Sequence, residues 1–127
     1  MAFKTTIAQA ILNKLLKGTD FTDGTDWDVS LHTADPGQTG ANEVTAGGYS
    51  YARQEPTFGT ISDNTATTTA DLTWTNMPAV TVTHVGLWWY ITDTWYFIWG
   101  GSLSAQKVVG AGDTFKIAAG DLDVTLT

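Results

Sequence analysis

The chain has 127 residues, of which 43% are hydrophobic, and its 13 acidic and 6 basic side chains give a formal net charge of −7. This length predicts one domain with a core of its own. The excess of acids, with Arg53 as the only arginine, argues against direct binding to a nucleic-acid backbone. The absence of cysteine excludes disulfides, thiolate metal sites and thiol catalysis.

No membrane segment is predicted. The longest apolar stretch, residues 85–99, is interrupted by Gly86 and by polar residues 92–94, and it is shorter than the ~20 residues of a spanning helix. The N-terminal segment lacks a continuous apolar core and a small-residue cleavage site, so we do not expect a signal peptide.

Residues 5–17 are predicted to form the one helix of the chain. Ile7, Ile11 and Leu15 recur at spacings of three and four residues, which places them on one side of a helix. Lysines in the last turn and Gly18 just after it are typical of a helix C-terminus. Because a lone helix of about 13 residues is marginal in water, we expect it to dock on its own β-domain or on a neighbouring subunit.

After this helix, turn signals separate short runs of strand-forming residues, which predicts a sandwich or barrel. Without further helices, a parallel α/β fold is excluded. We expect an all-β, antiparallel, jelly-roll-like β-sandwich with one short N-terminal α-helix. Residues 1–18 would form a helical anchor and residues 19–127 a single globular β-domain. The predicted strands are residues 27–33, 49–58, 66–73, 80–90, 95–102, 106–109, 113–118 and 122–126.

No catalytic site, metal site or cofactor is predicted. His32 and His84 lie on predicted strands beside turns, and the chain has neither G-x-S-x-G nor H-E-x-x-H. We interpret both histidines as structural, and expect His32 to bond across the entrance of the following loop. The acidic residues 20–28 superficially resemble a calcium loop but do not follow the EF-hand order. We interpret them as a solvated loop and keep weak calcium binding as a hypothesis.

Several runs carry a resemblance to a known family: LHTADPG, ANEV, GGYSYARQ, THVGLW, AGDTF and AAG. Over residues 28–126 the chain resembles small tailed-bacteriophage virion proteins that are often labelled tail-fibre or tail proteins. The resemblance implies a non-enzymatic structural protein of a virion, made in the host cytoplasm.

Within that class we interpret the chain as a capsid cement or decoration protein that binds the major capsid protein on the outer shell. It has neither a long coiled-coil or repeat shaft nor a second domain for host recognition. The alternative is a tail or tail-fibre component, with or without a surface that binds host carbohydrate.

Aromatic residues concentrate around the turn at residues 92–94. Strand alternation separates Trp95, Phe97 and Trp99 from Tyr96 on the predicted second strand of this hairpin. Both faces are therefore apolar, and the face outside the core needs a partner. A sister subunit in a homotrimer, another virion protein and a sugar are the three alternatives. The candidate interface residues are Ile7, Ile11, Leu15, Arg53, Trp89, Trp95, Tyr96 and Trp99.

Overall fold

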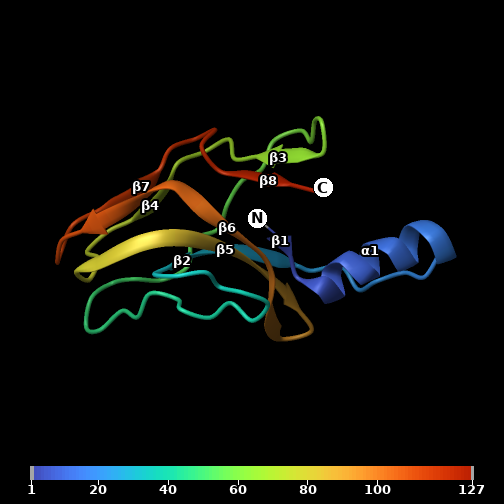
Figure 1. The fold of residues 1–127 in the computed structure, drawn as a ribbon, viewed down its shortest axis with the longest axis horizontal. Helices are drawn as coiled ribbons and strands as arrows, with labels where there is room; N and C mark the ends of the chain where they lie inside the picture. Colours follow the sequence, from blue (N-terminus) through green and yellow to red (C-terminus); the bar gives the residue numbers. More distant parts are fainter. Residues whose placement is uncertain (1, 127) are drawn as a thin grey trace.

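The computed structural model describes residues 2–126 and shows an antiparallel four-stranded sheet in the order β1-β6-β5-β2 (Figure 1). Two shorter antiparallel pairs, β3–β8 and β4–β7, lie over one face of this sheet. The prediction of an all-β antiparallel fold with one short helix is confirmed. The elements are β1 (Ala2–Phe3), α1 (Thr5–Lys17), β2 (Asp26–His32), β3 (Thr65–Thr67), β4 (Leu72–Trp74), β5 (Val80–Ile91), β6 (Thr94–Val109), β7 (Phe115–Ile117) and β8 (Asp123–Thr125).

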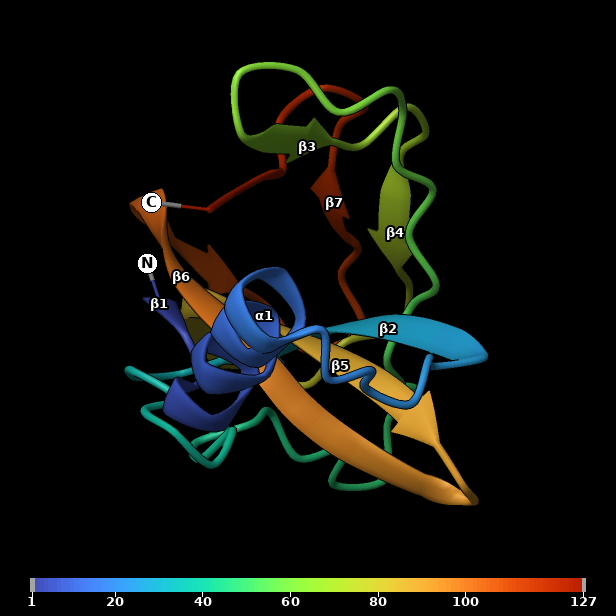
Figure 2. The same ribbon diagram turned by 90° about the vertical axis from the view of Figure 1, so that its right-hand side faces the viewer.

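The helix α1 has the predicted bounds, and Gly18 ends it in a left-handed conformation with φ of 68°. The helix points away from the β layers, as Figure 2 shows from the helix end of the molecule. The preceding strand β1 pairs with β6 and was missed from the sequence, because two residues carry no strand pattern.

The hairpin β5–β6 runs the length of the β layers and supplies most of the sheet (Figure 1). Its two-residue turn, Thr92 and Asp93, has φ of 47° and 64°, as in the primed turns that match strand twist. β6 runs as one strand through residues 103–105, where the sequence analysis predicted two separate strands. The pairing with β5 is nevertheless irregular there, since Val82 pairs with Lys107 whereas His84 pairs with Ser102.

A β-bulge lies in this hairpin and changes which residues share a face. Leu87 pairs with Trp99 whereas Trp88 pairs with Phe97, so Ile98 is the extra residue on β6. Trp99 therefore lies on the core side with Leu87 and is 2% exposed. The predicted alternation, which placed Trp99 on the face of Phe97, is wrong because it assumed an uninterrupted register.

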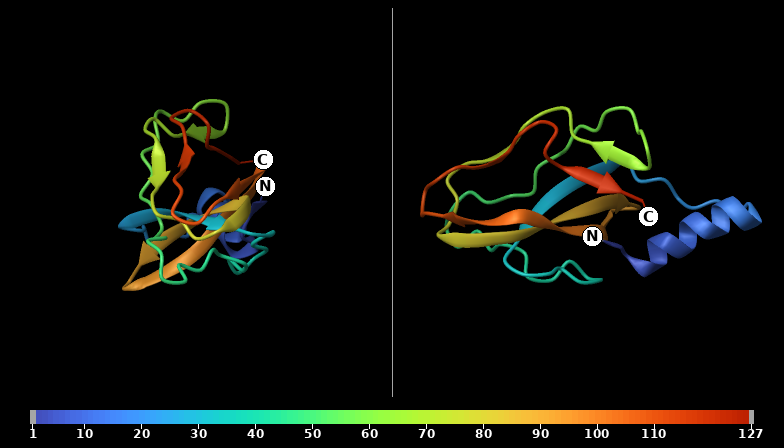
Figure 3. Two further views of the ribbon diagram at one scale, coloured as in Figure 1. Left: turned by 90° about the vertical axis from the view of Figure 1, so that its left-hand side faces the viewer. Right: turned by 45° about the horizontal axis from the view of Figure 1, so that its top comes forward.

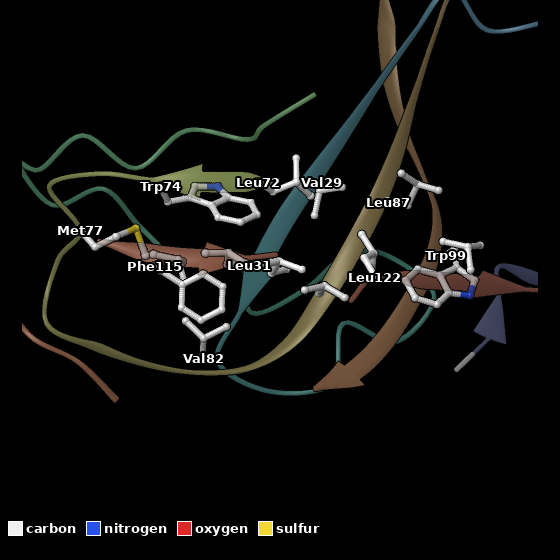
Figure 4. Packing of buried hydrophobic residues seen from close by; sticks show 14 of the residues in the cluster. Val29, Leu31, Leu72, Trp74, Met77, Val82, Leu87, Trp99, Phe115 and Leu122 are labelled. Carbon is white, nitrogen blue, oxygen red and sulfur yellow. The ribbon is translucent and has the colours of Figure 1, made fainter. Parts of the chain in front are cut away.

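The core lies between the sheet and the two short strand pairs. Leu31 and Val82 from the sheet meet Trp74 and Phe115 from the opposite layer (Figure 4). The rings of Trp74 and Phe115 meet edge to face, with centroids 5.7 Å apart. Full burial of an aliphatic side chain contributes about 1.5–3 kcal/mol, so this contact layer holds the two halves together.

Residues 33–64 form no named strand (Figure 3). The first part of this segment covers the other face of the sheet, where Pro36 packs against Gly100, whereas its last part joins the layer of β3, where Gly59 N–H donates to the Thr67 carbonyl. The prediction of a strand over residues 49–58 is therefore wrong. Only isolated pairs form there, such as Gln54 with Val29. Val44 N–H donates to the Leu31 carbonyl over 2.9 Å. These bonds cover the free edge of β2, which would otherwise expose unpaired backbone groups. The predicted strand at residues 66–73 is likewise interrupted, because Thr68 N–H bonds Leu122 and the chain turns there.

Candidate interaction surface

A buried polar network holds residues 33–64 on the sheet. Trp88 Nε1 donates to Ser30 Oγ over 2.8 Å, and Ser30 Oγ lies 2.6 Å from His32 Nε2. His32 Nδ1 lies 2.7 Å from the carbonyl oxygen of Ala41. A carbonyl only accepts, so Nδ1 carries the ring proton and the Ser30 hydroxyl donates to Nε2. Burial lowers the pKa of His32, which favours this neutral tautomer.

Ser30 and His32 have the contact of a nucleophile and its base, but the surroundings do not suit catalysis. Both residues are completely buried, and the group that orients the imidazole is a backbone carbonyl instead of a carboxylate. His32 bonds across the loop entrance, which confirms the structural role predicted for it. His84 is half-buried, with Nδ1 2.7 Å from Thr83 Oγ1.

A second group of side chains, centred on Glu43, extends this network to the protein surface. Arg53 donates to Glu43 twice, from Nε over 3.0 Å and from Nη2 over 2.8 Å, and Tyr51 donates over 2.8 Å. Burial would raise the pKa of Glu43, but the hydrogen bonds from Arg53 and Tyr51 together outweigh it and lower this pKa. Glu55 is the acid nearest to Arg53 in the sequence, but the ion pair in the structure is with Glu43.

The loop also packs closely on the outer aromatic face. The Arg53 guanidinium carbon lies 3.6 Å from the centre of the Trp88 ring. Gly40 abuts the same ring, since a Cβ on Gly40 would lie 2.5 Å from it. Pro36 is buried against Gly100 of β6. At Trp88 the chain itself thus covers the apolar hairpin face that was predicted to need a partner.

The runs LHTADPG, ANEV and GGYSYARQ supply the loop side of this network. Glu43, Tyr51 and Trp88 are not among the residues that the sequence pattern predicts to be functional. The signal available was an acid, a tyrosine and the single arginine within one short segment. The spacing of these residues does not show on which face of the sheet their side chains pack.

At the helix end of the sheet, Trp89 lies beneath α1 and the segment that follows it. Phe21 meets the Trp89 ring edge to face with centroids 6.0 Å apart, and Gly24 packs directly against the indole. A groove of about 200 Å³ separates the helix from the sheet. It is lined by Ile7, Ala10, Ile11, Phe21, Trp27, Trp89 and Ile98. Ile7 and Ile11 thus face the sheet, whereas Leu15 is exposed.

The tip of the β5–β6 hairpin carries the remaining predicted aromatic residues. Trp95 packs on Tyr90 with ring centroids 5.0 Å apart and is half-buried. Tyr96 is exposed. These two residues, with Leu15, are the candidate interface residues that the structure leaves most accessible to another molecule.

A groove, hereafter the layer groove, opens between the sheet and the β3–β8 pair. Its volume is about 530 Å³. It is lined by Phe3, Trp27, Glu55, Pro56, Thr57, Phe58, Ala66, Leu87, Ile98 and Val124. Glu55 is the one charged residue of this lining. Asp28 on the adjacent β2 has its pKa raised by burial and by the nearby carboxylates of Asp26 and Glu55, although Arg53 acts in the opposite direction.

The acidic residues 20–28 do not converge into a metal site. Among residues 2–126, no group of three or more His, Asp or Glu side chains is arranged to hold an ion. Asp20 instead forms an ion pair with Lys14 of the helix. Within the same residues, no helix is long and apolar enough to cross a membrane.

Comparison with protein families gives a match over nearly the whole chain. The family described as "Podophage GP4 fiber I protein gp80" matches residues 2–125. No curated protein shows a significant match to the chain. The family match extends over β1, α1 and every strand of both layers, including the loop that carries the polar network. The chain therefore belongs to the family of the podophage GP4 fiber I protein gp80.

Proposed function

We propose that the protein is a non-enzymatic structural subunit of a podophage tail fibre. The observation that carries the proposal is the match of a phage fibre family to residues 2–125. This match supports the tail-fibre alternative better than the interpretation as a capsid cement protein. It supports a position on the tail of the virion.

The arrangement of the polar residues supports a structural role. The Ser30–His32 pair has no access to solvent, and Arg53 is already bound to Glu43. Both sets hold the loop of residues 33–64 on the sheet. The surfaces that remain available to bind another molecule are therefore α1, the hairpin tip and the layer groove.

The position in the virion can be tested with a tag in an exposed turn. Asp63 and Asn64 form a two-residue turn with φ of 50° and 64°, away from the grooves, so a short epitope inserted there leaves the core intact. Gold-labelled antibody on purified particles should mark the tail. Label spread over the capsid, with copy numbers near that of the major capsid protein, would instead establish a cement role.

A second candidate function is the binding of host carbohydrate at the hairpin tip. The observation that favours it is the packed Tyr90–Trp95 pair beside the exposed Tyr96. Aromatic rings that present an apolar face and a polar edge suit sugar rings. Tyr96→Ala should then lower adsorption to host cells, whereas Tyr49→Ala, which removes an exposed aromatic from the loop, should not. Equal adsorption of both variants and the unmodified protein would exclude this candidate.

A further inference from the structure

The side of α1 that faces away from the sheet carries an uncovered apolar stripe. Leu12, Leu15 and Leu16 are 55%, 72% and 77% exposed. Positions three and four residues apart share one side of a helix, so these leucines form a continuous surface. The helix extends beyond the β layers, which leaves this side open (Figures 1 and 2). A short helix with such a stripe gains stability by docking it.

The distribution of charge indicates what the stripe docks on. Residues 1–18 contain three lysines and no acid, which gives them a charge of +3. Since the whole chain carries −7, the other residues carry −10. A basic helix is attracted to the acidic β-domain of another copy. Two such helices repel one another, which disfavours a symmetric contact between the leucine stripes of two copies.

The layer groove has the matching chemistry on the β-domain. Its lining is apolar apart from a few polar groups, and Glu55 lies on it. Within residues 2–126 neither Glu55 nor Lys17 at the end of α1 is in an ion pair.

We propose that α1 of one copy docks in the layer groove of a second copy, with the leucines on the apolar lining and Lys17 beside Glu55. The groove lies between the sheet and β3–β8, and α1 points away from these strands (Figure 1), so the contact joins different copies. A contact between two different surfaces closes into a ring when its rotation permits, which is compatible with the expected homotrimer. This inference stands independently of where the protein lies in the virion.

Cross-linking tests the contact directly, because the chain contains no cysteine. Leu16→Cys places a thiol on the exposed stripe, and Thr57→Cys places one in the lining of the layer groove. A mixture of the two single variants, carrying different tags, should form a disulfide-linked heterodimer under mild oxidation. Each variant alone should stay largely unlinked. Linkage of Leu16→Cys to itself, or no linkage in the mixture, overturns the proposal.

Charge reversal provides the second test. Lys17→Glu should lower the yield of the mixed cross-link about five- to tenfold, the effect of turning one attractive rim pair into a repulsive one. Glu55→Lys in the groove partner should restore the yield. Lys107→Glu is the matched control, since it makes the same charge change at an exposed site on β6 away from this groove. Equal loss with Lys107→Glu, or no rescue by Glu55→Lys, counts against the proposed pairing.

Discussion

The guanidinium carbon of Arg53 lies 3.6 Å from the centre of the Trp88 ring, while two nitrogens of the same side chain bind Glu43. Trp88 is on β5, and both Arg53 and Glu43 are in the covering loop. The planar guanidinium of Arg53 thus links two parts of the loop to each other, through Glu43, and links the loop to the sheet, through Trp88. Lysine offers neither the paired donors nor the flat face that this contact uses.

Arg53→Lys should therefore destabilise the fold although it preserves the charge. Loss of the two-point contact with Glu43 is expected to cost about 1.5–3 kcal/mol in the free energy of unfolding. Urea denaturation measures the difference. Lys107→Ala, at an exposed lysine without an ion pair among the described residues, is the control and should change stability little. A loss below that of the control would contradict a structural role for Arg53.

Acid should weaken the loop contacts in two steps. The pKa of His32 is lowered from 6.5 by burial, so its stabilising contribution is complete above pH 6.5 and is lost as the pH falls through the lowered value. The pKa of Glu43 is lowered from 4.5, where hydrogen bonds from Arg53 and Tyr51 outweigh burial. Its contribution is complete above pH 4.5 and is lost below it.

Chemical denaturation over this pH range separates the two groups. Glu43→Gln should remove the part of the pH dependence below pH 4.5 that comes from this carboxyl and leave the part that begins at 6.5. His32→Gln should do the reverse, although each variant starts from a lower stability. An unchanged profile above pH 4.5 in His32→Gln would contradict the assignment of the first step to His32.

Two glycines of the loop isolate the packing against Trp88. Gly37 and Gly40 both have positive φ, 59° and 75°, but only Gly40 abuts the Trp88 ring. Gly37→Ala should cost about 1–2 kcal/mol from backbone strain alone. Gly40→Ala adds overpacking of about 1–3 kcal/mol. Thermal denaturation measures both losses of stability. Equal losses for the two variants would show that the loop shifts at Trp88 and accommodates the added methyl group.

The sequence predicts the elements whose signals are local. The helix bounds follow from apolar spacing and the stop at Gly18, and the hairpin follows from its turn and strand-forming residues. The ion-pair partner of Arg53 could not be predicted in this way, because Glu43 lies ten residues earlier and reaches Arg53 only across a folded loop. Glu55, the nearer acid in sequence, instead lies on the layer groove.

Register errors account for the face assigned to Trp99. A one-residue bulge reverses every later side chain of a strand, and nothing in the run from Trp95 to Trp99 marks Ile98 as the extra residue. The loop of residues 33–64 was misassigned for a related reason. Its segment around Gln54 has the composition of a strand, but it pairs with β2 only at isolated residues.

Asp28 should destabilise the protein at neutral pH. Burial, Asp26 and Glu55 raise the pKa of Asp28 above 3.8, so the cost of its ionised form is present above the folded pKa and absent below 3.8. Asp28→Asn is expected to raise the melting temperature at pH 7 and to lose this advantage at pH 3.5. Asp121→Asn, at an exposed position, is the control. A lower melting temperature for Asp28→Asn at neutral pH would contradict the direction of the shift.

The two sides of α1 should respond differently to truncation. Ile7 packs against the core, so Ile7→Ala is expected to lower the free energy of unfolding by about 1–2 kcal/mol, less than full burial would give. Leu16 is exposed and alanine is the better helix former, so Leu16→Ala should stay within about 0.5 kcal/mol in dilute protein.

Raising the protein concentration separates stability of one chain from assembly. If the leucine stripe docks on a second copy, Leu16→Ala should lower the melting temperature relative to the unmodified protein only at concentrations where copies associate. The effect of Ile7→Ala is already present in dilute solution, because its contact is within the chain. Denaturation scans over a hundredfold range of concentration, with sedimentation velocity at each end, measure both effects. Equal losses for the two variants at the lowest concentration would mean that the leucine side of α1 packs within its own chain.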